Sequence, residues 1–336
     1  MTGEDPGVVS RQRIDRKASR RAFDRAAPLY AEAAVLAREI GSRHLERLAL
    51  IRVEPKHILD LGCGSGTHTL ALSQRFPDAT LIALDFSHAM LAQLENEHKP
   101  TDAGGTLSRI QRWFSVSTQQ KRRILPLQAD FERLPLAPGS IDFVWSNLAL
   151  AYAVDLPRVI QDISRVTRTN GLVMLTLPGP DTLAELRAAL ALLGLPDSTH
   201  PFPDMHDVGD MLMTAGFANP VVDSERITLE YTTTQRLRAD LRALGALTAR
   251  TDRPRGLMTP RRLRKIEDAL RGAAHADRQQ ESPGGSTCIR LTVEVAYAHA
   301  WKAEPRTIGN GRAIVRFERR ARPQAAGTAR PADDRV

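Results

Sequence analysis

Residues 58–66 read ILDLGCGSG, and this stretch decides the fold. It begins with a mostly apolar run of the kind that forms a buried strand, and glycines follow at alternate positions, at Gly62, Gly64 and Gly66. Glycine lets the backbone turn sharply and lets a ligand approach without a Cβ in the way. A helical pattern begins directly afterwards. The stretch therefore predicts a strand, a turn that faces a nucleotide-type ligand, and a helix.

The glycine spacing narrows the kind of ligand. A dinucleotide-binding turn of the GxGxxG type would need glycine at position 67, where this chain has Thr67. The spacing fits an adenosyl ligand that lacks a diphosphate, because such a ligand needs no strong cradle for an anion. A tight turn between a strand and a helix, with no ligand, would explain the same glycines. Taken alone, the glycines leave both interpretations open.

Outward from this stretch, short apolar runs alternate with helical patterns. Strands are expected at 57–61, 80–84, 124–128, 141–146, 172–177, 221–229 and 289–299. Helices are expected within 18–51, at 66–75, 87–97, 155–167, 181–193 and 205–215, and within 234–272. This order predicts an α/β, Rossmann-like fold with a doubly wound, seven-stranded, mostly parallel sheet and flanking helices.

Acidic and amide residues stand at the ends of the predicted strands. Asp60 lies in the first strand, Asp85 ends the second, Asp130 and Phe131 follow the third, and Asn147 ends the fourth. The carboxyl ends of parallel strands share one edge of the sheet. We therefore expect Asp85 to accept the ribose hydroxyls and Asp130 the adenine amino group, with Phe131 beside the adenine ring. Each residue alone could equally be a helix cap or a solvated loop residue.

Composition limits the class of protein. The 336 residues include only Cys63 and Cys288 as cysteines, too few for a disulfide framework. No run approaches the roughly eighteen apolar residues of a membrane span, and residues 1–17 lack the apolar stretch of a secretory signal. A cytoplasmic protein without a membrane segment is expected.

The formal net charge of +8 is unevenly distributed along the chain. Residues 56–98 carry five acids against two bases, whereas 99–123 carry six bases against one acid. Further basic segments lie at 250–271 and 302–330. Such runs attract nucleic acid, anionic lipid or an acidic protein, although flexible solvated segments carry the same charges.

We expect four parts along the chain. They are N-terminal helices that act as a lid (1–51), a cofactor-binding core (52–178), cap helices for the substrate with the last strands (179–302), and a basic tail that is disordered in part (303–336). Within the core, residues 99–123 are basic, contain glycine and lack periodicity. We interpret them as a mobile insertion.

Several motifs together resemble one family. They are ILDLGCGSG, ALDFSHAML (83–91), QADFERLPL (128–136), DFVWSNLAL (142–150), RRAFDRAAPLYAEAA (20–34) and LRALGALTARTDRPRGLMTPRRL (241–263). These runs resemble the class I S-adenosylmethionine-dependent methyltransferases and, within them, the malonyl-[acyl-carrier-protein] O-methyltransferases of biotin synthesis.

The resemblance implies a substrate, a cofactor and a set of site residues. The reaction would transfer a methyl group from S-adenosylmethionine to the free carboxylate of malonyl-acyl carrier protein. Tyr30 would lie near that methyl group, and either Arg238 or Arg242 would hold the carboxylate, since both can project from one face of a helix. The residues implied to bind the cofactor are Asp60, Gly62, Gly64, Gly66, Asp85, Phe86, Met90, Asp130, Phe131 and Asn147.

This chemistry needs neither a catalytic base nor a metal. A malonyl carboxylate with a pKa of about 4 is already ionised at neutral pH, so alignment and desolvation are the enzyme's contribution. No catalytic residue is therefore expected. His206 and Asp210 share a helix face, but two ligands do not make a metal site.

Two other functions stay open. The core and several flanking motifs are also similar to a respiratory complex assembly factor that acts on an arginine side chain. A nucleic-acid methyltransferase would suit the basic composition, yet the insertion contains only Trp113 and Phe114 as aromatic residues and no RNA-binding module is recognisable. Nucleic acid is therefore the less favoured partner.

Overall fold

The computed structural model describes residues 14–98, 123–197, 199–243, 251, 259–277 and 288–304. The contacts between residues divide the chain into two compact units, Met1–Ala303 and Glu304–Val336. The fold described here is that of the first unit. The predicted insertion lies outside the described residues except for Arg123. The predicted tail lies outside them except for Ala303 and Glu304.

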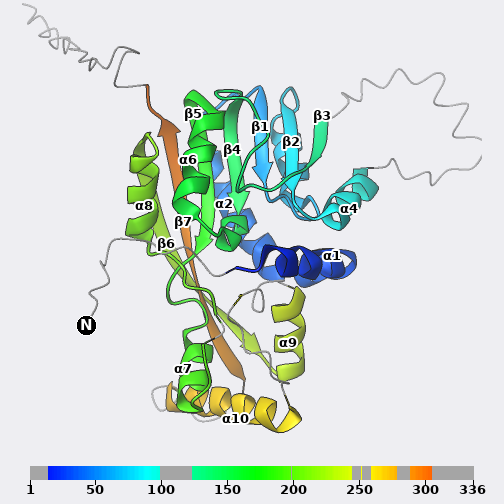
Figure 1. Cartoon of the computed structure of the whole chain (residues 1–336), viewed down its shortest axis with the longest axis vertical. Coiled ribbons are helices and arrows are strands. Elements are labelled where there is room, and N and C mark those ends of the chain that lie inside the picture. Colours follow the sequence, from blue (N-terminus) through cyan, green and yellow to red (C-terminus); the bar gives the residue numbers. More distant parts are fainter. Residues whose placement is uncertain are drawn as a thin grey trace, which may run out of the picture. The chain divides into compact units, whose positions relative to one another are not determined.

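Seven strands of the described chain form one sheet in the order β3-β2-β1-β4-β5-β7-β6. They are β1 (His57–Leu61), β2 (Thr80–Asp85), β3 (Arg123–Gln128), β4 (Ile141–Asn147), β5 (Thr167–Pro178), β6 (Phe217–Tyr231) and β7 (Ile289–Lys302). The strands from β3 to β5 are parallel, and β7 runs antiparallel to β5 and β6. The predicted seven-stranded, mostly parallel sheet is confirmed. Its strand order reverses between β1 and β4, which is where ligands bind in such sheets (Figure 1).

Helices cover both faces of this sheet. They are α1 (Arg16–Ala33), α2 (Val35–Ala49), α3 (Thr67–Arg75), α4 (His88–His98), the 3₁₀ helix η1 (Ala149–Tyr152), α6 (Leu156–Val166), α7 (Ala184–Leu192), α8 (Met205–Thr214), α9 (Thr234–Ala243) and α10 (Pro260–Asp277). Buried side chains of α6 and α8 pack on one face, and those of α2, α3 and α4 pack on the other. α7, α9 and α10 form a separate cluster with residues of β6 and β7. The expected helices are all found, with shifted ends.

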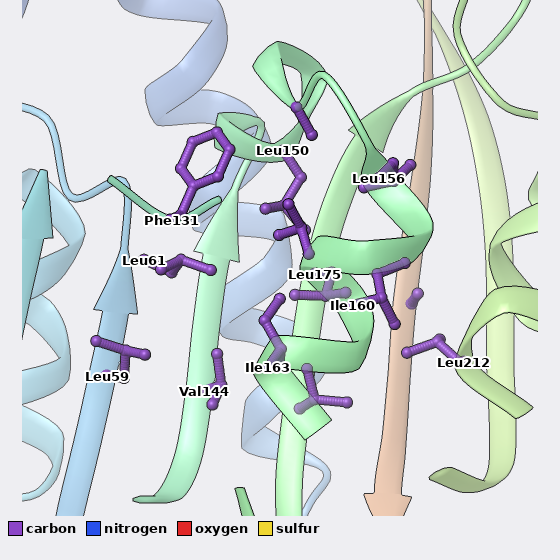
Figure 2. Packing of buried hydrophobic residues seen from close by; sticks show 14 of the residues in the cluster. Leu59, Leu61, Phe131, Val144, Leu150, Leu156, Ile160, Ile163, Leu175 and Leu212 are labelled. Carbon is purple, nitrogen blue, oxygen red and sulfur yellow. The ribbon is translucent and has the colours of Figure 1, made fainter. Parts of the chain in front are cut away.

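The central strands are buried on both faces, which fixes their position. In β4, Phe143 and Trp145 belong to the cluster on the α2 and α3 side, whereas Val144 belongs to the cluster that contains α6. Figure 2 shows Val144 beside Ile163 of α6, and both side chains are fully buried. Truncating such a side chain costs about 2–5 kcal/mol of stability. The carboxyl ends of β1, β2 and β4 therefore rest on a rigid frame.

Two strands begin earlier than predicted. β5 starts at Thr167 and contains Asn170 and Gly171, a pair of residues that favours a turn, where the pairing with β4 shifts register and Asn170 has φ of 62°. β6 starts at Phe217 although Pro220 follows, because the pairing with β7 also shifts at that point. In both places the residue that favours a turn lies in a bulge, where it is not paired with the neighbouring strand, so the strand continues beyond it.

Candidate functional site

The glycine turn joins β1 to α3 at the carboxyl edge of the sheet. The backbone N–H groups of Gly62 and Cys63 both donate to the carbonyl of Leu84, at N···O distances of 2.8 and 3.0 Å. Gly62 has φ of 78°, and a Cβ there would lie 2.2 Å from the Cβ of Ala149. Both its backbone conformation and this close approach require glycine at position 62.

A first cavity, with about 640 Å³ of empty space, lies beside this turn. It is lined by the predicted residues Tyr30, Gly62, Gly64, Asp85, Phe86, Met90, Phe131 and Asn147. The carboxyl ends of β1, β2 and β4 and the helices α1 and α2 all contribute to its wall.

Asp85 ends β2 with its carboxylate bonded to the glycine turn. Its Oδ2 accepts a hydrogen bond from the N–H of Gly64 at 3.0 Å, and its Oδ1 accepts one from Ser87 at 2.8 Å. Burial raises the pKa of Asp85 to about 6, although these backbone bonds act to lower it. A carboxylate has roughly four lone-pair sites, so ligand hydroxyls can still donate to this one.

A second cavity, with about 460 Å³ of empty space, shares Tyr30, Gly62 and Gly64 with the first. Asp60 borders it and accepts a hydrogen bond from the hydroxyl of Thr69 at 2.6 Å. Burial raises the pKa of Asp60 to about 7, against the lowering effect of Thr69. The carboxyl group is therefore only partly ionised at neutral pH, and a cationic ligand would favour its ionised form.

Arg38 and His68 also border the second cavity, although neither residue was among the predicted site residues. Burial lowers the pKa of His68, with a further contribution from the charge of Arg38, and its Nε2 is buried without a hydrogen-bond partner. His68 belongs to the first turn of α3, and Arg38 lines the same cavity as this turn, whose free N–H groups favour an anion. They come together because the ring of His68 packs against Gly41 of α2, a contact without a local signal in the sequence.

An aromatic cluster on α1 and η1 covers the first cavity. The ring of Phe23 packs edge-on against Tyr30, Phe86 and Tyr152, with centroids 6.3, 5.7 and 5.1 Å away. Burial raises the pKa of Tyr30 to about 12, with a further contribution from Asp85, so its hydroxyl stays protonated. Phe23 and Tyr152 were not among the predicted site residues, since Phe23 is visible in the sequence only as part of an apolar helix face.

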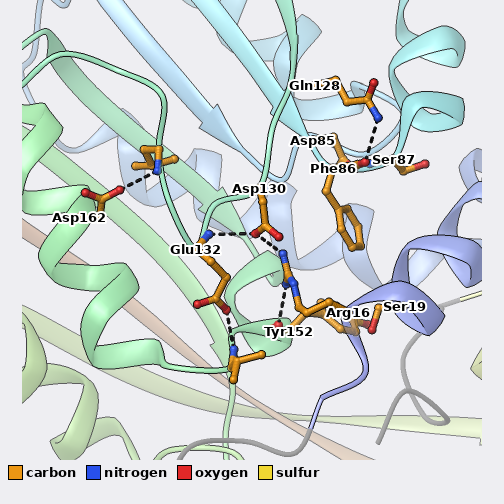
Figure 3. A network of polar contacts seen from close by, with 12 residues as sticks. Arg16, Ser19, Asp85, Phe86, Ser87, Gln128, Asp130, Glu132, Tyr152 and Asp162 are labelled. Carbon is orange, nitrogen blue, oxygen red and sulfur yellow. Dashed lines mark hydrogen bonds and ion pairs between the residues drawn. The ribbon is translucent and has the colours of Figure 1, made fainter. Parts of the chain in front are cut away.

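Asp130 borders neither cavity and instead forms an ion pair with Arg16 (Figure 3). The guanidinium group of Arg16 also donates to the carbonyl of Tyr152 at 3.0 Å. It lies over the rings of Phe86 and Phe131, 5.2 and 4.8 Å from their centroids. Arg16 thus contacts the residues expected to surround an adenine ring. The contact of Asp130 with an adenine stays a prediction.

The polar atoms of Asn147 are already bonded within the protein. Its Nδ2 donates to the carbonyl of Ala37 and its Oδ1 accepts from the hydroxyl of Thr176, both at 2.8 Å. Asn147 therefore connects α2 to β4 and β5. Gly66 lines neither cavity, and a Cβ there would lie 2.2 Å from Cδ1 of Leu94. The structure thus gives Asn147 and Gly66 packing contacts that the sequence pattern did not indicate.

The two candidate arginines lie four positions apart on α9, as predicted from their spacing. The side chains of Arg238 and Arg242 are outside the described part of the chain. α9 packs against α1, the helix that covers the first cavity. Their contact with a substrate carboxylate stays a prediction.

The described residues contain no group of three or more His, Cys, Asp or Glu side chains placed to hold a metal ion. Asp204 caps α8 instead, since its Oδ1 accepts from the N–H of His206 at 2.8 Å and Asp207 completes a capping box. A search of the same residues for a helix of membrane-spanning length and apolarity finds none.

Known proteins share the core of this fold. Residues 59–175 match a family described as a methyltransferase domain. The YcgJ protein of Bacillus subtilis superposes with a TM-score of 0.51 at 16% sequence identity, covering 79% of this chain and 98% of that protein. The structural likeness at this identity concerns the fold alone.

Relatives with higher sequence identity align with nearly the whole chain. The malonyl-[acyl-carrier protein] O-methyltransferase of Halorhodospira halophila is 41% identical over 290 residues, which are 86% of this chain and 89% of the relative. The protein of the same name from Gallionella capsiferriformans is 40% identical over 305 residues, which are 90% of this chain and 96% of the relative. Identity of this level extends over 86–90% of this chain, and the chain therefore belongs to the malonyl-[acyl-carrier protein] O-methyltransferase family.

Proposed function

We propose that the protein transfers a methyl group from S-adenosylmethionine to the free carboxylate of malonyl-acyl carrier protein, an early step of biotin synthesis. The observation that carries the proposal is the pair of adjoining cavities around Gly64, with Asp85 in the first and Asp60 and Arg38 beside the second. The relatives that align over the lid, core and cap support the substrate.

The residues of the two cavities fit this cofactor. Asp85 would accept the ribose hydroxyls in the first cavity, where apolar side chains surround the space for a base. Asp60 and Arg38 would face the ammonium and carboxylate groups of its amino-acid end in the second. Gly64 borders both cavities, and a Cβ there would lie 3.4 Å from the ring of Tyr30. Because glycine has no Cβ, the space that the two cavities share stays open for one extended ligand.

When bound, S-adenosylmethionine supplies a sulfonium methyl group that a carboxylate oxygen can take in one displacement. The malonyl carboxylate, with a pKa of about 4, is ionised at neutral pH, so no residue has to remove a proton. Phe23, Tyr30 and Tyr152 exclude water on the side of α1. An arginine of α9, Arg238 or Arg242, would orient the carboxylate. Alignment of this kind can lower a barrier by several kcal/mol, up to about 7–11 kcal/mol.

The test is transfer of labelled methyl from S-adenosylmethionine to malonyl-acyl carrier protein. Acetyl-acyl carrier protein is the matched control, because it differs by the missing carboxylate. We expect a base-labile methyl ester on the malonyl form alone. Labelling of neither carrier, or equal labelling of both, would contradict the proposed function.

A further inference from the structure

The outward face of α1 carries a stripe of positive charge. Lys17, Arg21 and Arg25 are exposed and follow one another at four-residue spacing. At a rise of about 1.5 Å per residue they form a line of about 12 Å along one side of the helix. We call these three residues the α1 ridge.

The described residues around the α1 ridge do not neutralise its charge. No ion pair between described residues involves any of its three members, whose like charges at four-residue spacing repel one another. The nearest acid on the same helix, Asp24, is engaged elsewhere. It lies 3.9 Å from Arg20 and accepts a hydrogen bond from the hydroxyl of Ser87 at 2.6 Å. An acidic partner would therefore find three available cations on this face.

The opposite face of α1 borders the first cavity. Phe23 and Tyr30 line that cavity from α1, so the ridge and the cavity are separated by about one helix diameter, roughly 10–12 Å. Exposed apolar side chains follow the ridge along the chain. Leu29 is 66% exposed near the end of α1, and Val35 is 60% exposed at the start of α2. Apolar contacts next to a basic stripe favour a protein partner over the phosphates of a nucleic acid.

We propose that the α1 ridge is the docking surface for an acidic helix of the acyl carrier protein. The inference rests on the proposed function, in which the malonyl group arrives on the long flexible arm of a carrier. Acyl carrier proteins are acidic. A carrier docked on the outward face of α1 would bring its arm close to the first cavity, which the opposite face of α1 borders. The charge of the ridge would steer the encounter, and Leu29 and Val35 would contribute apolar contact.

The decisive variant reverses the charge of the ridge, as Lys17→Glu, Arg21→Glu and Arg25→Glu together. A matched control makes the same change of net charge at exposed sites on other elements, as Arg52→Glu, Lys56→Glu and Arg158→Glu. Each variant is measured with malonyl-acyl carrier protein and with malonyl-pantetheine, which carries the same thioester without the protein. Binding of the unloaded carrier protein is measured separately by fluorescence anisotropy.

We expect the ridge variant to raise the KM for malonyl-acyl carrier protein and the Kd for the unloaded carrier by about ten-fold or more. Turnover of malonyl-pantetheine and affinity for S-adenosylhomocysteine should stay unchanged, as should all four quantities in the control variant. The KM of the unaltered protein for the carrier should also rise with salt, and this dependence should weaken in the ridge variant.

Three outcomes would overturn the docking surface. The first is an unchanged Kd for the carrier, and the second is an equal loss of turnover with malonyl-pantetheine. The third is ridge-dependent binding of a duplex oligonucleotide while carrier binding is unaffected, which would make nucleic acid the occupant. Failure of the proposed function looks different, because neither thioester is then methylated, whereas carrier binding still reports on the ridge.

Discussion

Asp85 shows how one side chain can serve both the fold and a ligand. Its two oxygens accept backbone hydrogen bonds from Gly64 and Ser87, so the carboxylate fixes the glycine turn against the start of α4. Burial nevertheless raises its pKa to about 6, which means that the buried environment destabilises the negative charge. A ligand that donates hydroxyl groups or brings positive charge would relieve this cost.

We predict that Asp85→Asn weakens binding of S-adenosylhomocysteine by about 1.5–3 kcal/mol, because the ribose hydroxyls lose a charged acceptor. Asparagine keeps the size of the side chain but replaces one of the two acceptor oxygens by an N–H₂ group that faces a backbone N–H, so the free energy of unfolding should also fall, by about 1–3 kcal/mol. Isothermal titration calorimetry measures the affinity, and Glu46→Gln, at an exposed position of α2, serves as the control. Unchanged affinity in Asp85→Asn would remove this residue from the site.

Arg38 is the second residue that we expect to contact the ligand. It borders the second cavity together with His68 at the N-terminal turn of α3, an environment that suits a carboxylate. We predict that Arg38→Met weakens S-adenosylhomocysteine by about ten-fold or more but leaves 5′-methylthioadenosine unchanged, because the latter lacks the amino-acid end. Competition binding with both ligands checks this, with Arg52→Met as the control. Equal loss of both ligands would show that Arg38 supports the fold instead.

At the scale of elements, the sequence predicts what is local and misses what the packing of helices creates. The strand, glycine turn and helix from residue 57 to 75 follow from patterns within a few residues. Asp85 follows from the edge that parallel strands share. Arg16 over Phe86, by contrast, depends on how α1 lies across that edge, and no periodicity contains this information. Arg16, Phe23 and Arg38, which lie on α1 and α2, are therefore residues that sequence reasoning did not assign.

The position of α9 is likewise set by the packing of helices. Its helical spacing can be predicted from the sequence, but its contact with α1 cannot. We predict that alanine at one of Arg238 and Arg242, and not at the other, lowers kcat/KM for malonyl-acyl carrier protein by roughly ten- to a hundred-fold. Lysine at that position should restore part of the activity, because it lacks the planar, two-pronged donor. Affinity for S-adenosylhomocysteine should be unaffected. Full activity in both alanine variants would move the carboxylate contact off this helix.

At the scale of the whole molecule, protonation couples the fold to the site. Burial raises the pKa of Asp60 to about 7 and that of Asp85 to about 6, from ordinary values of 3.8. The folded chain therefore binds more protons than the unfolded chain between about pH 4 and pH 7. The stability that these two groups contribute is complete below pH 4, and it is lost as the pH rises through 6 and 7.

Ligand binding should respond to pH in the opposite direction. An ammonium group near Asp60 and ribose hydroxyls on Asp85 favour the ionised carboxylates, so affinity for S-adenosylhomocysteine should rise from pH 5 to pH 8. Binding at pH 6.5 should release protons, which calorimetry in phosphate and in imidazole buffers detects as a difference in observed heat. The ligand-induced rise in Tm should likewise be larger at pH 8 than at pH 5. In a chain with both Asp60→Asn and Asp85→Asn, proton release should disappear. If that variant still released protons, or if the unaltered protein bound equally well at both pH values, the two buried carboxyl groups would not be the ones that meet the ligand.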